Sequence, residues 1–216
     1  MTTDKEPAEN ITPELAKDTP TILFDLGGVI VKNGFWDWVG SHTPEETQQS
    51  AYHSVIDAAD AGQITEEECM KQLGELSHRP ANVVSDELNA AYSPHEEVIE
   101  ILGELKERKY PLVLVTNFMK GRANGLLDKY DLRKYFDKVF ISSEMGLTKP
   151  SPEFFRTVNT ELGISPVQGI FIDDSARNTE VATSEGITRS WQYTNPQDLR
   201  ERFQQAHVLP PKTPKP

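Results

Sequence analysis

The stretch TILFDLGGVIV, residues 21–31, decides how the rest of the chain is interpreted. Its first four residues are largely apolar and strand-prone, an acid follows at Asp25, and two glycines precede a return to apolar character. This pattern is typical of a buried parallel strand that ends in a tight loop. Asp25 is therefore predicted at the carboxyl end of a strand, where open α/β sheets bind ligands. A carboxylate there is either a structural acid or a nucleophile, and the spacing alone leaves both open.

Three later strand ends also carry polar side chains. In chain order they offer a Thr-Asn pair, a lysine and a pair of acids, at positions Thr116, Asn117, Lys149, Asp173 and Asp174. Taken one at a time, these residues would be an ordinary turn, a surface lysine before a proline, and a helix cap. Their common position after predicted strands favours a shared function.

Together with Asp25, this order of residue types resembles the haloacid dehalogenase (HAD) superfamily of phosphohydrolases. The resemblance covers about residues 20–195, and four motifs in register are far more specific than any one of them. It implies an α/β fold, with a Rossmann-like three-layer core around a parallel sheet and a small helical cap inserted after the first strand. The alternation of strand and helix patterns after residue 93 also predicts a parallel sheet covered on both faces.

The chain is predicted to divide into a core and an insert. Between residues 33 and 92 no strand pattern occurs, but helix starts are predicted at Thr43-Pro44-Glu45-Glu46, Thr65 and Ser85. The resemblance makes this helical insert a type C1 cap, and further helices are predicted to begin after Ser151 and Asn195. The predicted boundaries are residues 20–32 and 93–207 for the core, 33–92 for the cap, and 1–19 and 208–216 for two disordered segments.

The resemblance implies a phosphate site around Asp25. Asp25 would be the nucleophile, forming an aspartyl phosphate that water later hydrolyses. Lys149 would pair with the Asp25 carboxylate and with the phosphate. The backbone at Leu26 and Gly27 and the side chains of Thr116 and Asn117 would donate hydrogen bonds to phosphate oxygens.

The same resemblance implies Mg2+ as the cofactor. A hard cation neutralises the repulsion between a carboxylate nucleophile and a phosphate group, and Mg2+ suits a site rich in carboxylates. The implied ligands are the Asp25 carboxylate, the backbone carbonyl of Gly27 and the Asp174 carboxylate, with Asp173 direct or through water.

One residue departs from the pattern of the resembled phosphatases. Most of them carry a second aspartate two residues after the nucleophile, which acts as general acid and then as general base, and this chain has Gly27 there. Loss of such a group costs on the order of a hundred to ten-thousand fold in rate. Either the enzyme acts on good leaving groups or borrows an acid, or it is an inactive relative that binds a ligand or a partner. Candidates for a borrowed acid in or beside the cap are His42, His53, His78, His95, Glu45, Glu46, Glu66, Glu67 and Glu68.

Two further enzyme or signalling classes share part of this pattern. Receiver domains of signalling systems place their acidic pair before the phosphoacceptor, whereas here it comes last, which sets that interpretation aside. A 2-haloacid dehalogenase shares the fold and the nucleophile, but it needs no metal and typically has serines where Asp173 and Asp174 stand. The acids therefore favour phosphate chemistry.

Composition limits the partners. The 216 residues carry a net charge of -12, which disfavours nucleic acid, and Cys69 is the only cysteine, which excludes an internal disulfide. No apolar run predicts a signal peptide or a membrane span, so a cytoplasmic protein is expected. Lys71 and Arg79 are the only lysine and arginine in the predicted cap, which favours a small neutral sugar or polyol phosphate as the partner. The aromatic residues Phe35, Trp36 and Trp38 form either cap core or a lid over the substrate, and the oligomeric state is left open.

Overall fold

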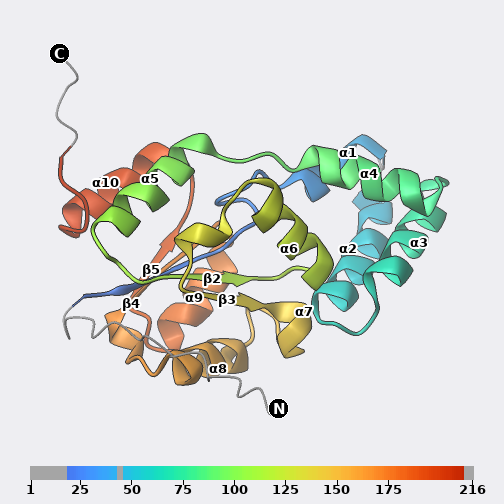
Figure 1. Ribbon diagram of the computed structural model, residues 1–216. Coiled ribbons are helices and arrows are strands. Elements are labelled where there is room, and N and C mark those ends of the chain that lie inside the picture. Colours follow the sequence, from blue (N-terminus) through green and yellow to red (C-terminus); the bar gives the residue numbers. More distant parts are fainter. Residues whose placement is uncertain (1–18, 43–45, 212–216) are drawn as a thin grey trace, which may run out of the picture.

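The computed structural model describes residues 19–42 and 46–211, and its core has the predicted α/β architecture. The described residues form a five-stranded sheet in the order β3-β2-β1-β4-β5, and every neighbouring pair of strands is parallel (Figure 1). The strands are β1 (Thr21–Phe24), β2 (Leu112–Thr116), β3 (Lys138–Ile141), β4 (Gly169–Asp173) and β5 (Arg189–Gln192).

The central strands β1, β2 and β4 are buried at every residue. Strands covered by helices on both faces have continuous apolar sequences, as the stretch before Asp25 does. The register places Phe24 of β1 beside Leu114 of β2 and Ile172 of β4. The carboxyl ends of the three strands therefore lie side by side, which brings Asp25 next to the residues that end β2 and β4.

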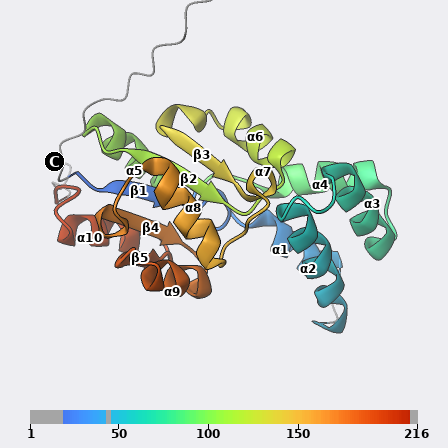
Figure 2. The same ribbon diagram turned by 90° about the horizontal axis from the view of Figure 1, so that it is seen from below.

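Helices cover both faces of the sheet and complete the expected three-layer core. One face carries α5 (Glu96–Glu107), α6 (Lys120–Lys129) and α10 (Pro196–Gln205), and the other carries α8 (Pro152–Leu162) and α9 (Ala176–Ser184). Side chains alternate between the faces, so Phe24 packs in the first layer and Leu23 in the second. Figure 2 shows α8 lying across the second face. Short helices in the connections are η1 (Arg133–Tyr135), α7 (Ser142–Met145) and η2 (Pro166–Gln168).

Between residues 33 and 92 the described part of the chain contains helices and no strand. These helices are α1 (Gly34–His42), α2 (Glu46–Asp60), α3 (Glu66–Ser77) and α4 (Ala81–Ala91). They pack on one another beyond one end of the sheet (Figures 1 and 2), and we call them the cap. Among the described residues, no helix combines the length and the apolar character that crossing a membrane requires.

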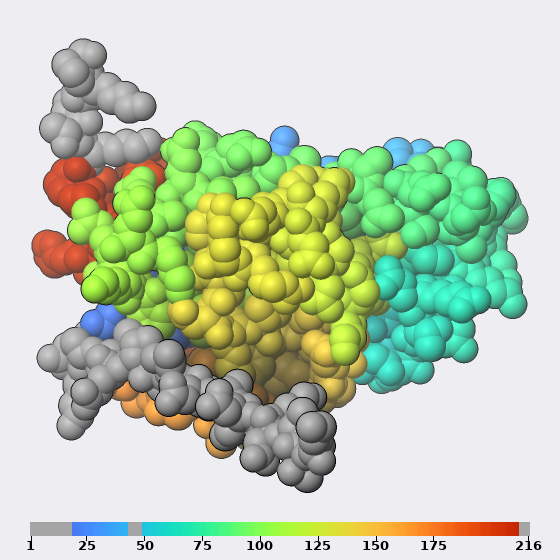
Figure 3. Space-filling model, viewed as in Figure 1, coloured from blue at the N-terminus to red at the C-terminus, as the bar shows by residue number. Residues whose placement is uncertain are grey.

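A buried arginine joins the cap to the core. Arg122 of α6 is only 4% exposed, and its Nη2 lies 3.2 Å from Glu66 Oε1 of α3. Its Nη1 donates a hydrogen bond of 2.7 Å to Asn89 Oδ1 of α4. In the space-filling view the cap lies directly against the core surface around α6 (Figure 3). Removing one of these partners would leave a buried charge incompletely paired, which is costly, so these contacts tie the cap to the core.

The helix starts predicted from capping residues are mostly correct. Thr65 and Glu68 form the predicted capping box of α3, and the side chains of Ser151 and Asn195 cap α8 and α10. The prediction that Ser85 caps a helix is wrong, because α4 already begins at Ala81, after Pro80. The start predicted at residues 43–45 lies outside the described residues.

The predicted end of the folded core is also corrected. A disordered segment was expected from residue 208, but Val208 and Leu209 are buried, at 4% and 3% exposure. Their backbone N–H groups both donate to the carbonyl of Phe203, so the chain folds back on the end of α10. Two apolar side chains after the helix explain this return, because they bury area that an extended tail would expose. The expected disorder of residues 1–18 and 212–216 lies outside the described residues.

Leu209→Ala tests this packing. Removing a buried leucine side chain leaves a cavity, so we expect the free energy of unfolding to fall by about 2 kcal/mol. Urea denaturation followed by circular dichroism measures this change. Pro210→Ala is the control, because Pro210 is exposed and its loss should change little. Equal stability of Leu209→Ala and the native protein would contradict the buried position.

Candidate active site

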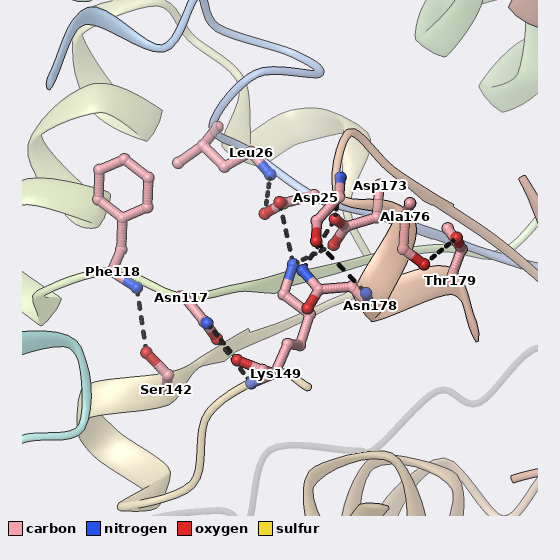
Figure 4. A network of polar contacts seen from close by, with 11 residues as sticks. Asp25, Leu26, Asn117, Phe118, Ser142, Lys149, Asp173, Ala176, Asn178 and Thr179 are labelled. Atoms are coloured by element: carbon pink, nitrogen blue, oxygen red, sulfur yellow. Dashed lines mark hydrogen bonds and ion pairs between the residues drawn. The ribbon is translucent and has the colours of Figure 1, made fainter. Parts of the chain in front are cut away.

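The site lies at the carboxyl edge of the sheet, where β1, β2 and β4 end. Asp25 follows β1 directly and is 8% exposed, and Asp173 is the last residue of β4 and fully buried. Lys149 lies on the loop between α7 and α8 and points up between these two acids (Figure 4). The structure therefore brings together side chains that are far apart in the sequence, as the strand-end pattern predicts.

The Lys149 ammonium is shared by two carboxylates. Its Nζ lies 3.0 Å from Asp25 Oδ2 and 2.6 Å from Asp173 Oδ2. Burial disfavours the charged form of Lys149, but the two carboxylates outweigh this effect and raise its pKa. Lys149 therefore stays charged and holds two acids that would otherwise repel each other.

The site still has excess negative charge around Asp25. The pKa of Asp25 is raised to about 7, chiefly by burial; Lys149 acts to lower it, and the charges of Asp173 and Asp174 act to raise it. One lysine thus faces three acids. A divalent cation is the simplest means of balancing them.

The donor set fits such a cation. Carboxylate oxygens of Asp25, Asp173 and Asp174 all lie within 4.8 Å of one another, and hard oxygen ligands are those that Mg2+ prefers. Gly28 permits this approach, because a Cβ atom at that position would lie 2.1 Å from Asp174 Oδ2. Gly28 also has a φ of 74°, in the left-handed region that favours glycine. Both features indicate that the loop after β1 is shaped to bring Asp174 next to Asp25.

The two acids after β4 have different surroundings. Asp173 Oδ2 pairs with Lys149, while its Oδ1 accepts hydrogen bonds from the Ser175 N–H at 2.9 Å and Asn178 Nδ2 at 2.8 Å. Asp174 is half-buried and faces the cavity. Asp174 is therefore the more accessible ligand, and Asp173 orients Lys149 and the start of α9. In the loop after β1, the backbone N–H of Leu26 donates a hydrogen bond of 2.7 Å to Asp25 Oδ1. Gly27 borders the cavity, and a contact between its carbonyl and a metal ion stays a prediction.

Thr116 and Asn117, which share a prediction as phosphate donors, differ in their hydrogen bonds. Thr116 is fully buried, and its hydroxyl has no hydrogen-bond partner among the described residues, so its contact with phosphate stays a prediction. The Asn117 side chain is already used: its Nδ2 donates to the Lys149 carbonyl at 2.8 Å, and its Oδ1 accepts from the Lys149 N–H at 2.9 Å. The Asn117 amide therefore fixes the backbone that carries Lys149. Its second N–H is not used in these bonds and Asn117 borders the cavity, so its contact with phosphate stays a prediction.

The place of the missing second aspartate is covered by an aromatic ring. A Cβ atom built on Gly27 would lie 3.1 Å from Cε2 of Phe118, which is tighter than an ordinary contact. The Phe118 ring also packs on Tyr92, with centroids 5.6 Å apart. An aspartate at position 27 would therefore need Phe118 to move.

A cavity of about 200 Å³ separates the core site from the cap. Its core side includes Asp25, Gly27 and Asp174, and its cap side is formed by Phe35, Trp36, Ile56, Asp57 and Asp60. Phe35 and Trp36 thus border the cavity, whereas Trp38 belongs to the cap interior, where its Nε1 donates to Glu87 at 2.9 Å. Trp38 therefore fits the interpretation as cap core, whereas Phe35 and Trp36 have the position that the interpretation as a lid over the substrate requires.

The candidates for a borrowed acid whose side chains are described lie away from the cavity, and Glu45 lies outside the described residues. Neither His42, His53, His78 nor His95 lines the cavity, and His42 and His53 stack on tryptophan rings instead. Glu66 pairs with Arg122 and Glu68 belongs to the capping box of α3. Sequence reasoning missed Asp57 and Asp60, the two acids of α2 that do border the cavity. The available signal was their position in the last turn of a helix, where acidic side chains are disfavoured.

Fold and site define a class: an α/β protein in which a lysine and three acids meet at the carboxyl edge of a parallel sheet. The family model of haloacid dehalogenase-like hydrolases matches residues 19–186. The chain belongs to the haloacid dehalogenase-like hydrolase family, as its four motifs predict.

Curated relatives are phosphatases of small molecules. Phosphoglycolate phosphatase of Shigella boydii is 32% identical over 143 residues, which are 64% of this chain and 56% of that protein. D-ribitol-5-phosphate phosphatase of Bacteroides thetaiotaomicron is 27% identical over 206 residues, which are 84% of this chain and 95% of that protein. The match thus spans little more than half of the first relative and nearly all of the second.

A solved structure agrees with the fold and the predicted cofactor. The magnesium complex of a HAD family enzyme from Bacteroides thetaiotaomicron superposes with a TM-score of 0.70 and 25% identity, over 86% of this chain and 98% of that chain. The same enzyme was also solved with magnesium and inorganic phosphate. The acids of the present site supply the oxygen ligands that such a magnesium ion needs.

Mg2+ should stabilise the native protein through these acids. Binding to the folded state alone adds about 2.7 kcal/mol to the free energy of unfolding when the free ion is at a hundred times its dissociation constant. We expect a rise in melting temperature on adding Mg2+, measured by differential scanning calorimetry, and its loss in Asp174→Asn. Asp131→Asn is the matched control on the exposed surface and should respond as the native protein does. A full response in Asp174→Asn would contradict the assigned site.

Substitutions of Asn117 and Thr116 should have different effects on the free energy of unfolding. Asn117→Ala removes two hydrogen bonds to the Lys149 backbone, so we expect the free energy of unfolding to fall by about 2 kcal/mol in ligand-free protein. Thr116→Val removes a buried hydroxyl without a partner and should leave stability equal or higher. Phosphate binding, followed by isothermal titration calorimetry with Mg2+ present, should nevertheless weaken in Thr116→Val. Unchanged stability of Asn117→Ala would show that its side chain does not fix the Lys149 loop.

Proposed function

We propose that this chain is a Mg2+-dependent phosphatase that hydrolyses a small phosphomonoester, of the sugar or polyol phosphate type, through an aspartyl phosphate on Asp25. The observation that carries the proposal is the Asp25–Lys149–Asp173 arrangement, at 3.0 and 2.6 Å, on the core side of a cavity that the cap covers. The family and the names of the two relatives support phosphate ester hydrolysis. A cytoplasmic location stays an expectation from the sequence.

Each residue has a chemical task in this proposal. Lys149 and the Leu26 N–H fix the Asp25 carboxylate through one oxygen each, so that the carboxylate has a defined orientation toward the phosphorus atom. The free Thr116 hydroxyl would donate to a phosphate oxygen. Lys149 would lie beside the oxygens that gain charge during transfer. Mg2+, when bound to the acids, would supply further positive charge against the phosphate.

The cavity supports a small and largely neutral alcohol. Its volume of about 200 Å³ leaves room for few atoms besides the phosphate. Phe35 and Trp36 provide apolar and aromatic surface on the cap side, and the cap residues that border the cavity include no lysine or arginine. A second phosphate group would meet the acid Asp57 there, which disfavours multiply charged substrates.

Activity assays on phosphate esters test the proposal. We expect phosphate release from p-nitrophenyl phosphate and from members of a sugar and polyol phosphate panel, with loss on chelation of Mg2+. Asp25→Asn removes the nucleophile and should lower kcat by about a thousand-fold or more. Asp131→Asn serves as the control for an exposed aspartate and should retain the native rate.

The alternative function is a catalytically inactive protein that binds a ligand or a partner, which Gly27 in place of the second aspartate favours. Folded, Mg2+-loaded protein without turnover on any panel member would support this alternative. Metal-independent release of halide from 2-haloacids would instead support a dehalogenase. Metal-dependent phosphate release that Asp25→Asn abolishes would exclude both.

A further inference from the structure

We propose that Asp60 of the cap donates the proton to the leaving oxygen and later takes a proton from the attacking water, in place of the aspartate that position 27 lacks. This assignment rests on the phosphatase function proposed above. It differs from the pattern of the resembled phosphatases, in which the acid belongs to the same loop as the nucleophile. Here the acid comes from a helix of the insert.

The first support is position. Asp60 is the last residue of α2 and lines the same cavity as Asp25, Gly27 and Asp174. Asp25 lies on the core side of this cavity and Asp60 on the cap side. A phosphoester whose phosphorus atom faces Asp25 therefore directs its alcohol part toward the cap, where the leaving oxygen would need a proton.

The second support is the anchoring of α2 to the core. Ser142 Oγ donates a hydrogen bond of 2.5 Å to the Asp60 carbonyl. The same oxygen accepts a hydrogen bond of 3.0 Å from the Phe118 N–H. Phe118 is the residue whose ring covers Gly27. One serine hydroxyl thus joins the backbone of the residue whose ring covers Gly27 to the backbone of Asp60.

The third support is that Asp60 has no ion-pair partner. Among the described residues no lysine, arginine or histidine forms an ion pair with Asp60, and the last turn of α2 contains no basic residue. A negative charge at the C-terminal end of a helix is disfavoured by the helix dipole. Stability alone would favour an uncharged side chain at this position. An asparagine has nearly the same volume and no acidic proton, and it would serve a packing role equally well.

The surroundings of Asp60 also favour its protonated form. The pKa of Asp60 is raised to about 8, chiefly by burial and also by the charges of Asp57 and Asp25, against the lowering effects of Lys149 and a backbone hydrogen bond from Met119. A carboxyl group that keeps its proton near neutral pH is suited to give that proton to an alkoxide. The neighbouring Asp57 is exposed.

The first chemical step is balanced with Asp60 as the acid. An oxygen of the Asp25 carboxylate attacks phosphorus, the bond between phosphorus and the alcohol oxygen breaks, and the alcohol oxygen takes the proton of the Asp60 carboxyl group. The products are an aspartyl phosphate, a neutral alcohol and an Asp60 carboxylate.

The second step restores both residues. Water attacks phosphorus and gives one proton to the Asp60 carboxylate, while the bond between phosphorus and the Asp25 oxygen breaks. Inorganic phosphate leaves, Asp25 is again a carboxylate and Asp60 is again protonated. The sum of the two steps is hydrolysis of one ester by one water molecule.

Dependence of the rate on the leaving group tests this role. The probes are substituted aryl phosphates, from p-nitrophenyl phosphate to phenyl phosphate, whose phenols become steadily less acidic at similar size. For Asp60→Asn we expect kcat/KM to fall by about a hundred-fold on phenyl phosphate and by no more than about threefold on p-nitrophenyl phosphate, because only the poor leaving group needs the acid. The plot of log kcat/KM against the pKa of the phenol should therefore become steeper.

Matched variants separate proton transfer from a merely structural effect. Asp57→Asn removes the same type of group one turn earlier and should keep the slope of the native protein, whatever its effect on the rates. Asp60→Glu keeps a carboxyl group and should keep a shallower slope than Asp60→Asn. Circular dichroism and the melting temperature check that each variant is folded, and Asp60→Ser replaces Asp60→Asn if the latter is not.

A burst experiment examines the second step. Without the base that activates water, Asp60→Asn should release p-nitrophenolate in a rapid burst equal to the enzyme concentration, followed by slow turnover. Unchanged slope and no burst in folded Asp60→Asn, with Asp25→Asn inactive, would overturn the role of Asp60 and leave the phosphatase function intact. A native protein inactive on every aryl phosphate, or an active Asp25→Asn, would overturn the phosphatase function and this inference with it.

Discussion

The pairing of one buried lysine with two buried acids is the interaction on which this site depends. Lys149 is 3% exposed, and its ammonium lies between carboxylates from the ends of two different strands. Removing one partner from such a group leaves a desolvated charge, which is far more costly than losing a surface ion pair. The hydrogen bonds from Asn117 to the backbone of Lys149 fix the loop from the other side. The site is therefore preorganised in part by groups, such as Asp173 and Asn117, that need not contact a substrate to hold Lys149 in place.

The core motifs could be predicted from the sequence because each one is local. A strand that ends in an acid or a small polar residue has a recognisable pattern, and a parallel register brings such ends to one edge. Asp25 and Asp173 therefore lie side by side as the strand order requires, and Lys149 reaches them from the loop between α7 and α8. The side-chain direction of Asn117 has no such local signature, since it depends on the path of a loop that is distant in the sequence.

The cap was less predictable for a related reason. α1 is rich in aromatic residues and has no capping signal at its start, so its helical period was not recognised, and Ser85 resembled a cap within a helix that had already begun. Asp60 was missed because its role follows only from the docking of α2 on the core. Likewise, the burial of Val208 and Leu209 depends on a surface that α10 creates. The sequence does not reveal contacts that form only when separate elements pack together in the folded protein.

The buried Arg122 ties the helical insert to the core. Its contacts with Glu66 and Asn89 join α3 and α4 to α6, so helices from two distant parts of the chain share one guanidinium. Loss of this side chain would leave Asn89 and the partly buried Glu66 without a partner at the junction. A substitution there would therefore disturb how the cap is seated on the core, although Arg122 itself does not line the cavity.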